Sequence, residues 1–225
     1  MKKYAIIVAG GSGSRMQSEL PKQFLVLSGK PILLHTLEAF HLFDSEMELI
    51  VVLPETHSDT WELLKKEHQC NIPHMTIQGG DTRFDSVQNG LSSIIDQEGL
   101  VAIHDGARPL VSPQVIARTF ESAEKNGNGI AAVALKDSLR TMVAGENQAV
   151  DRSSYLAIQT PQTFRLDLIK LAFDKAQGNA FTDDASVAEA DGRKIHLVEG
   201  DYANIKVTTP EDLVIAEALL KHHKQ

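Results

Sequence analysis

Three glycines within four residues follow a short apolar stretch near the start of the chain. The stretch ends at Ala9, and Gly10, Gly11 and Gly13 come directly after it. Glycine allows backbone angles and close approaches that other side chains block. Successive N–H groups of such a segment can form a concave site for an anion. A tight turn after a buried strand would need the same glycines, so the glycines alone do not decide between a turn and a binding loop.

Two cations beside these glycines favour binding. Arg15 lies just after the glycines, and Lys22 follows seven residues later beside Pro21. An Arg guanidinium can hold two phosphate oxygens in a planar fork, and a Lys ammonium acts as a compact point charge. The combination indicates a polyphosphate.

Two common phosphate-binding motifs do not fit this segment. The P-loop needs Ser or Thr after Gly-Lys, but Pro31 follows Gly29-Lys30. The dinucleotide fingerprint needs a third glycine where Met16 stands, and it lacks the acidic residue expected further along. An NAD-binding oxidoreductase is therefore the disfavoured alternative from another class of protein.

The elements that must position these residues alternate between strands and helices. Apolar runs predict strands at Ala5–Ala9, Leu49–Leu53, Met75–Ile77, Leu100–Ile103 and Ile130–Leu135. Helical spacing predicts helices at Pro31–Phe43, Thr60–Glu67, Phe84–Ile95 and Pro113–Lys125, and a last one after Pro210. We expect an α/β fold: a Rossmann-like, mostly parallel sheet with helices on both faces. The 225 residues fit one domain over residues 1–225.

Residues 136–157 interrupt this alternation. Their apolar positions alternate with polar ones, and Gly145-Glu146-Asn147 predicts a turn. We expect a β-hairpin arm that projects from the core. Because a lone hairpin is marginally stable, it must pack on something. A second subunit is the preferred partner, which predicts a homodimer; the alternative is a hairpin folded over its own domain.

Composition excludes several classes of function. The net charge of −8 argues against broad nucleic-acid binding, because phosphate backbones are held by basic surfaces. No apolar run approaches the roughly 20 residues that span a bilayer, so we expect no membrane association. The single cysteine, Cys70, rules out an internal disulfide and agrees with a cytoplasmic location.

The first glycine segment resembles the start of the cytidylyltransferases in the nucleotide-diphosphosugar transferase superfamily. Their GGxGxRM and PKQ signatures are matched by residues 10–16 and 21–23. Later segments match in order along nearly the whole chain: residues 79–87 (GGDTRFDSV), 104–109 (HDGARP, with Gly106 where alanine is usual), 160–164 (TPQTF), 182–185 (TDDA) and 199–212 (EGDYANIKVTTPED). Within the superfamily, the chain is most similar to the 2-C-methyl-D-erythritol 4-phosphate cytidylyltransferase family. The ribitol-5-phosphate cytidylyltransferases share most motifs and remain the alternative.

The resemblance implies a reaction and a set of residues. CTP and methylerythritol 4-phosphate would give a CDP-alcohol and pyrophosphate in non-mevalonate isoprenoid synthesis, with Mg²⁺ or another divalent cation bridging the triphosphate. The implied catalytic residues are Arg15, Lys22, Arg152 and Lys206. The implied nucleotide-binding residues are Ala9, Gly10, Gly11, Gly13, Gly80, Arg83 and Ser86. The implied substrate-binding residues are Asp105, Arg108 and Thr182, and Asp105 is also the candidate metal ligand.

Ordinary structural interpretations exist for several of these residues. Asp105 follows a parallel strand, at the edge where α/β sheets bind ligands, but it could instead pair with Arg108 to stiffen the loop. Asp183-Asp184 could be acids in the first turn of a helix capped by Thr182.

Other implied residues also have ordinary structural interpretations. Lys206 in a short strand, Ile205–Val207, would ordinarily face solvent. Arg152 would be a surface charge, whereas the resemblance implies that it reaches a neighbouring subunit's site. Gly80, Arg83 and Ser86 could simply form an ordinary helix start.

A catalytically silent binding module is a further alternative for the whole chain, although the charged residues that catalysis needs are all present.

Overall fold

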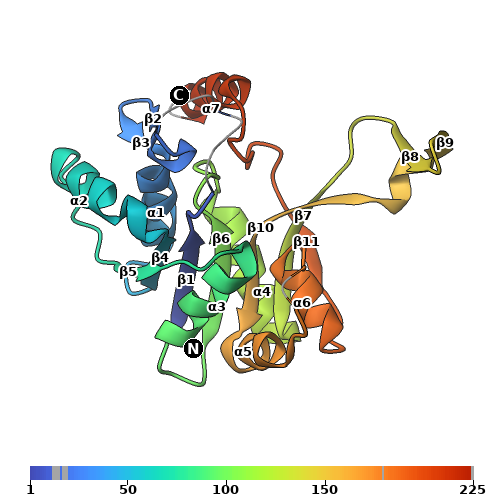
Figure 1. Cartoon of the computed structure of the whole chain (residues 1–225), viewed down its shortest axis with the longest axis horizontal. Helices are drawn as coiled ribbons and strands as arrows, with labels where there is room; N and C mark the ends of the chain where they lie inside the picture. Colours follow the sequence, from blue (N-terminus) through green and yellow to red (C-terminus); the bar gives the residue numbers. More distant parts are fainter. Residues whose placement is uncertain (12–15, 17–19, 179, 224–225) are drawn as a thin grey trace.

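A seven-stranded sheet forms the centre of the molecule (Figure 1). The structure, a computed structural model, describes residues 1–11, 16, 20–178 and 180–223. The strand order is β11-β7-β10-β6-β1-β4-β5. The strands are β1 (Lys3–Val8), β4 (Glu48–Leu53), β5 (Met75–Gln78), β6 (Leu100–Asp105), β7 (Asn128–Ala134), β10 (Leu156–Arg165) and β11 (Leu197–Glu199). All neighbouring pairs are parallel except those of β10, which is antiparallel to both β6 and β7. The expected α/β fold with a mostly parallel sheet is confirmed.

Helices cover both faces of this sheet (Figure 1). They are α1 (Ile32–Phe43), α2 (Ser58–Glu67), α3 (Arg83–Ser93), α4 (Pro113–Asn126), α5 (Leu166–Lys175), α6 (Asp184–Ala190) and α7 (Pro210–His223). Short connections add β2 (Val26–Leu27), β3 (Lys30–Pro31) and a 3-10 turn at Lys22–Phe24. No described helix is both long and apolar enough to cross a bilayer.

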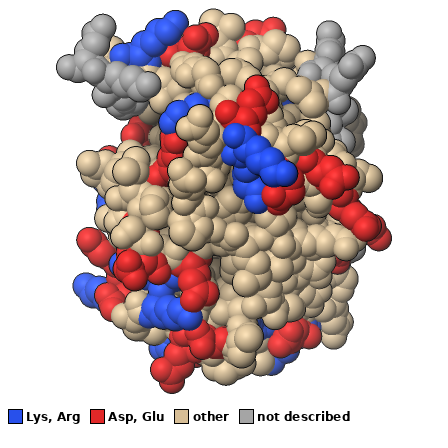
Figure 2. Space-filling view, turned by 90° about the vertical axis from the view of Figure 1, so that its left-hand side faces the viewer, with Lys and Arg blue, Asp and Glu red and all other residues tan. Residues whose placement is uncertain are grey.

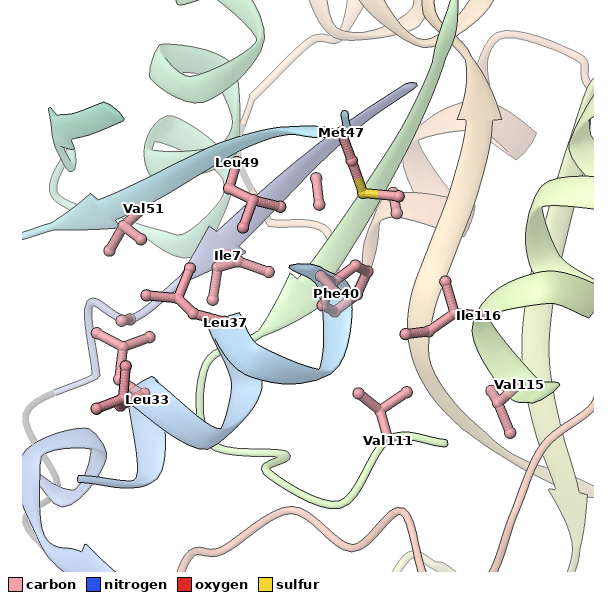
Figure 3. Close-up of a cluster of buried hydrophobic side chains, with 14 of the residues drawn as sticks. Ile7, Leu33, Leu37, Phe40, Met47, Leu49, Val51, Val111, Val115 and Ile116 are labelled. Carbon is pink, nitrogen blue, oxygen red and sulfur yellow. The ribbon is translucent and has the colours of Figure 1, made fainter. Parts of the chain in front are cut away.

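Alternation along β1 explains why both faces are covered. Ala5 and Ile7 lie in a buried cluster with side chains of α1 and α4, whereas Tyr4 and Ile6 lie in a second cluster with α3, α5 and α6. Figure 3 shows the first cluster, in which Ile7 faces the side chains of α1. Because successive side chains of a strand point to opposite faces, a fully buried strand needs apolar residues at every position.

Capping residues set the starts of several helices. Ser112 caps α4 by accepting a hydrogen bond from the Val115 N–H, and Pro113 occupies the first turn, as predicted. Thr82 caps α3, which begins at Arg83 rather than Phe84. The cap of α6 is Asp183, so the prediction that Thr182 caps this helix was wrong. The reason is the reciprocal bonding between Asp183 and Ser186, which Thr182 is one residue too early to make.

The hairpin at residues 139–150 lies away from the main sheet (Figure 1). It consists of β8 (Leu139–Val143) and β9 (Glu146–Val150), which form a separate two-stranded sheet. Its turn is Ala144-Gly145, both at positive φ, so the predicted turn at residues 145–147 is shifted by one residue. Residues Leu156 and Ala157, assigned to the arm from sequence, pair with β7 in the main sheet.

Charges are mixed on the face seen in Figure 2. Lys and Arg side chains lie beside Asp and Glu there, and the described residues of this face form no continuous basic surface. This agrees with the net charge of −8.

Candidate functional site

A cleft opens at the carboxyl ends of β1, β5 and β6. Chain order runs from β1 outward through β4 to β5 and then returns to the other side of β1 at β6. Such a reversal is where open α/β sheets bind ligands. The cleft has a volume of about 200 Å³ and is lined by nine of the residues implied from sequence: Ala9, Gly10, Gly11, Lys22, Gly80, Arg83, Ser86, Asp105 and Lys206. Arg15 and Gly13 lie outside the described residues.

The Pro21-Lys22-Gln23-Phe24 turn holds Lys22 beside the glycine loop. Gln23 is 1% exposed, and its Nε2 donates a hydrogen bond to the Ala9 carbonyl at 2.5 Å. Phe24 stacks on Trp61 in the core with ring centroids 6.1 Å apart. A Cβ added at Gly11 would lie 3.8 Å from Lys22 Cε. The buried neighbours thus anchor the turn and leave Lys22 at the cleft. Gln23 was not assigned a role from sequence, although the PKQ motif includes it.

The start of α3 forms the opposite wall of the cleft. Thr82 and Asp85 make a capping box, and Ser86 Oγ accepts a hydrogen bond from the Gly80 N–H at 3.1 Å. A Cβ at Gly80 would overlap with the Asp85 side chain. Glycine is therefore required by packing at this position, and the loop is drawn onto the helix start. The ordinary helix-start interpretation and the binding interpretation are compatible here. Asp85 went unassigned, although the spacing T-x-x-D signals the cap.

Asp105 lies at the end of β6, opposite Val8 in the register with β1. Its Oδ2 is 3.0 Å from Lys206 Nζ and 3.3 Å from Arg108 Nε, and its Oδ1 is 3.7 Å from Arg83 Nε. Burial disfavours the charged form of this carboxyl. The three cations outweigh burial and hold the pKa of Asp105 well below its ordinary value. The predicted Asp105–Arg108 pair is present, and two further cations join it.

A second cavity adjoins the first. Its volume is about 290 Å³, and its lining includes Arg108, Thr182, Gln159 and Asp183. Arg83, Asp105 and Lys206 line both cavities. The residues implied for the nucleotide and for the substrate therefore face two spaces that meet at these three charged side chains.

Lys206 reaches this junction without belonging to a strand. The structure assigns no strand to residues 205–207, so the predicted strand was wrong. The segment is instead held by the Val207 N–H, which donates to the Ala107 carbonyl at 2.8 Å, and by the fully buried Asn204. Asn204 Nδ2 donates to the Thr160 carbonyl at 2.8 Å, and the main-chain carbonyl of Asn204 accepts a hydrogen bond from the Arg108 guanidinium. These contacts join segments that are distant in the sequence, so the sequence alone does not predict the structural role of Asn204.

Arg152 lines neither cavity. It lies in a 3-10 turn after β9, and its guanidinium donates to the Lys136 carbonyl. Within one chain the structure does not bring Arg152 to the other implied residues.

The described residues do not form a ready metal site. They contain no cluster of three His, Cys, Asp or Glu side chains suited to a metal. The Asp105 carboxylate faces three cations, which leaves it poorly placed to bind a metal directly. The assignment of Asp105 as a metal ligand does not fit this arrangement. A divalent ion in the cleft would need phosphate oxygens for most of its coordination.

The chain is similar to known proteins along almost its whole length. The family model described as 2-C-methyl-D-erythritol 4-phosphate cytidylyltransferase matches residues 4–222. A relative of that name from Bacteroides thetaiotaomicron is 48% identical over 98% of this chain and 100% of its own length. Another from Bacillus velezensis is 40% identical over 98% of this chain and 97% of its own length.

Solved structures give the same result for the fold. A 4-diphosphocytidyl-2C-methyl-D-erythritol synthase from Anaerococcus prevotii is 30% identical with a TM-score of 0.84, covering 98% of this chain and 96% of its own. The 2-C-methyl-D-erythritol 4-phosphate cytidylyltransferase from Thermus thermophilus is 32% identical with a TM-score of 0.81, covering 98% and 100%. Sequence and fold together show that this chain belongs to the 2-C-methyl-D-erythritol 4-phosphate cytidylyltransferase family.

Proposed function

We propose that this chain transfers a cytidylyl group from CTP to 2-C-methyl-D-erythritol 4-phosphate, releasing pyrophosphate in isoprenoid biosynthesis. The observation that carries the proposal is the meeting of two cavities at Arg83, Asp105 and Lys206. A transfer reaction needs two substrates held side by side, with cations that stabilise the charge developing where they meet. The family match disfavours the ribitol-5-phosphate alternative.

CTP occupies the first cleft in this proposal. The Ala9-Gly10-Gly11 backbone cradles the triphosphate together with Gly13, and the segments around Gly80 and Ser86 hold the cytosine and ribose. Lys22 and Arg15 stabilise the charge that grows on the α-phosphate and the leaving pyrophosphate. The support is the position of Lys22 beside Gly11 and the shared lining of the cleft.

The phosphate of the acceptor alcohol occupies the second cavity. Arg108 and Thr182 line that cavity, and Lys206 stands at its junction with the first. Lys206 orients the attacking phosphate with help from Thr182. We assign Arg152 to the same phosphate in a neighbouring subunit, because its position on the arm side lies outside both cavities of its own chain. This assignment requires a homodimer formed through the arm.

No general base is needed for this chemistry. A phosphate monoester is already largely ionised near neutral pH, and its oxygen attacks the α-phosphorus directly. His104, which precedes Asp105 in the sequence, does not serve as a base, because burial lowers its pKa to about 3 and its Nε2 donates to the Arg108 carbonyl. The chain therefore acts by positioning substrates and stabilising charge. We assign Mg²⁺ to the CTP phosphates as part of the substrate complex, and the reaction to the cytoplasm.

A pyrophosphate-release assay tests the proposal. The purified protein is incubated with CTP, UTP, ATP or GTP, each with methylerythritol 4-phosphate or ribitol 5-phosphate. We expect release to be fastest with CTP and methylerythritol 4-phosphate. Faster release with ribitol 5-phosphate would favour the alternative substrate, and no release with any pair would favour a silent binding module. A nicotinamide cofactor that raises the melting temperature when CTP does not would revive the oxidoreductase alternative.

A further inference from the structure

The two acids at the start of α6 have different partners. Asp183 caps the helix and bonds Ser186, as helix-start acids commonly do. Asp184 is 1% exposed, and its carboxylate accepts two hydrogen bonds from the Arg83 guanidinium, at 2.9 and 2.7 Å. A paired arrangement of this kind fixes both the position and the plane of the guanidinium. Capping therefore does not account for Asp184.

The start of α6 is itself anchored to the central sheet. Gln162 of β10 is 1% exposed; its Nε2 donates to Asp183 Oδ2 at 2.9 Å, and its Oε1 accepts from the Ala185 N–H at 2.8 Å. Gln162 lies opposite Ile103 of β6 in the sheet. The buried Gln162 side chain thus fixes Asp183 and Ala185, the two neighbours of Asp184 in the sequence. The carboxylate that orients Arg83 has a rigid support.

Arg83 lies at the junction of the two cavities, where a small displacement of its guanidinium would change the charge that both substrates meet. It lines both cavities, and its Nε is 3.7 Å from Asp105 Oδ1. Asp105 already contacts Lys206 and Arg108. Without a second carboxylate, the Arg83 guanidinium would be drawn toward Asp105 and would compete with Lys206 for it. Asp184 prevents this by holding the two terminal nitrogens of the guanidinium, while only Nε lies near Asp105.

We propose that Asp184 is a positioning residue that orients the Arg83 guanidinium at the junction of the nucleotide and acceptor cavities. The inference rests on the proposed function. Asp184 does not line either cavity, so it acts only through Arg83. Every effect of changing Asp184 on turnover should then disappear when Arg83 is already absent.

A double-mutant cycle tests this dependence. The proteins are wild type, Asp184→Asn, Arg83→Gln and the double variant. Asp191→Asn is the matched control, because Asp191 is an ion-paired carboxylate just after the other end of α6 and lies outside both cavities. We expect Asp184→Asn to lower kcat by about 10–10²-fold, because it misplaces a cation at the point where the two substrates meet. Asp191→Asn should stay within about twofold of wild type, since it touches neither cavity.

The double variant separates positioning from a general structural role. Arg83→Gln leaves the buried Asp184 carboxylate without its cation, so it should lower the melting temperature. Adding Asp184→Asn should raise the melting temperature again while kcat stays within about twofold of Arg83→Gln alone. A purely structural Asp184 would instead lower both quantities in either background. If Arg83→Gln does not fold, the cycle is run on Arg83→Lys, which keeps a charge beside Asp184.

Several results would overturn the inference. These are an Asp184→Asn kcat within twofold of the control, an unaltered kcat in Arg83→Gln, or losses that add in the double variant. Titration calorimetry with CTP alone separates this inference from the proposed reaction. If the wild type binds CTP but releases no pyrophosphate, the reaction is refuted, and the inference then requires Asp184→Asn to weaken CTP binding about tenfold only when Arg83 is present. If CTP does not bind the wild type, both proposals fail.

Discussion

Lys206 Nζ lies 3.0 Å from Asp105 Oδ2, and this contact joins the C-terminal segment to the end of a central strand. The Asp105 side chain is 11% exposed, whereas the Lys206 side chain is 40% exposed and borders both cavities. The carboxylate therefore works as a buried anchor for a cation that remains accessible to ligand. Arg83 and Arg108 share the same anchor, so a single strand-end residue organises three cations.

Lys22→Ala should abolish most of the turnover without unfolding the protein. Lys22 stands beside Gly11 in the cleft, and the loss of one well-aimed transition-state contact costs about 10²-fold or more in kcat. The matched control is Lys30→Ala, which removes a surface ion pair with Glu38 outside both cavities. Steady-state kinetics and circular dichroism check the pair of variants. Near-wild-type turnover in Lys22→Ala would refute the role assigned to this lysine.

Gly80→Ala should destabilise the protein because its methyl group would overlap with the Asp85 side chain. Overpacking of this kind costs about 1–3 kcal/mol in the free energy of unfolding, and urea denaturation measures it. Gly10→Ala is the comparison, since its methyl group would meet Ser86 Oγ and Pro54 Cδ at 3.8 and 4.0 Å. That variant should be unchanged or up to about 1 kcal/mol more stable. Equal losses in both variants would contradict the packing argument.

Mixing two inactive variants tests whether Arg152 acts across subunits. If each site takes Lys22 from one chain and Arg152 from its partner, a heterodimer of Lys22→Ala and Arg152→Ala chains contains one intact site. An equal mixture, unfolded and refolded together, should recover about a quarter of wild-type activity, because half of the dimers are mixed and each has one working site. No recovery, or a fully active monomer in size-exclusion chromatography, would exclude the role in a neighbouring site.

His104 should make folding sensitive to mild acid. Burial lowers the pKa of His104 to about 3, whereas an unfolded histidine has a pKa of about 6.5. As the pH falls from about 6.5 toward 3, the unfolded chain binds a proton at His104 that the folded chain does not. The free energy of unfolding therefore decreases. Between pH 7 and 4.5 the wild type should lose about 2–3 kcal/mol more than His104→Gln, which lacks this titration. Urea unfolding at both pH values provides the measurement, and equal losses in the two proteins would show that His104 does not titrate in this way.

Local patterns were sufficient to predict much of the fold. The apolar runs at β1, β4 and β6 and the capping of α4 by Ser112 are properties of neighbouring residues, so they can be read along the chain. The glycine spacing with Lys22 likewise indicates a phosphate-binding loop, and the order of motifs along the chain indicates the family.

Tertiary structure decided how the charged residues are combined. The sequence alone could not show that Asp184 would hold Arg83, that Gln162 would anchor α6, or that Lys206 would reach Asp105 from an irregular segment. These contacts arise because strands distant in the chain become neighbours in the sheet and bring their following loops to one edge. Ion pairing between such loops depends on distance and burial in three dimensions, and neither quantity is encoded in the spacing of residues along the chain.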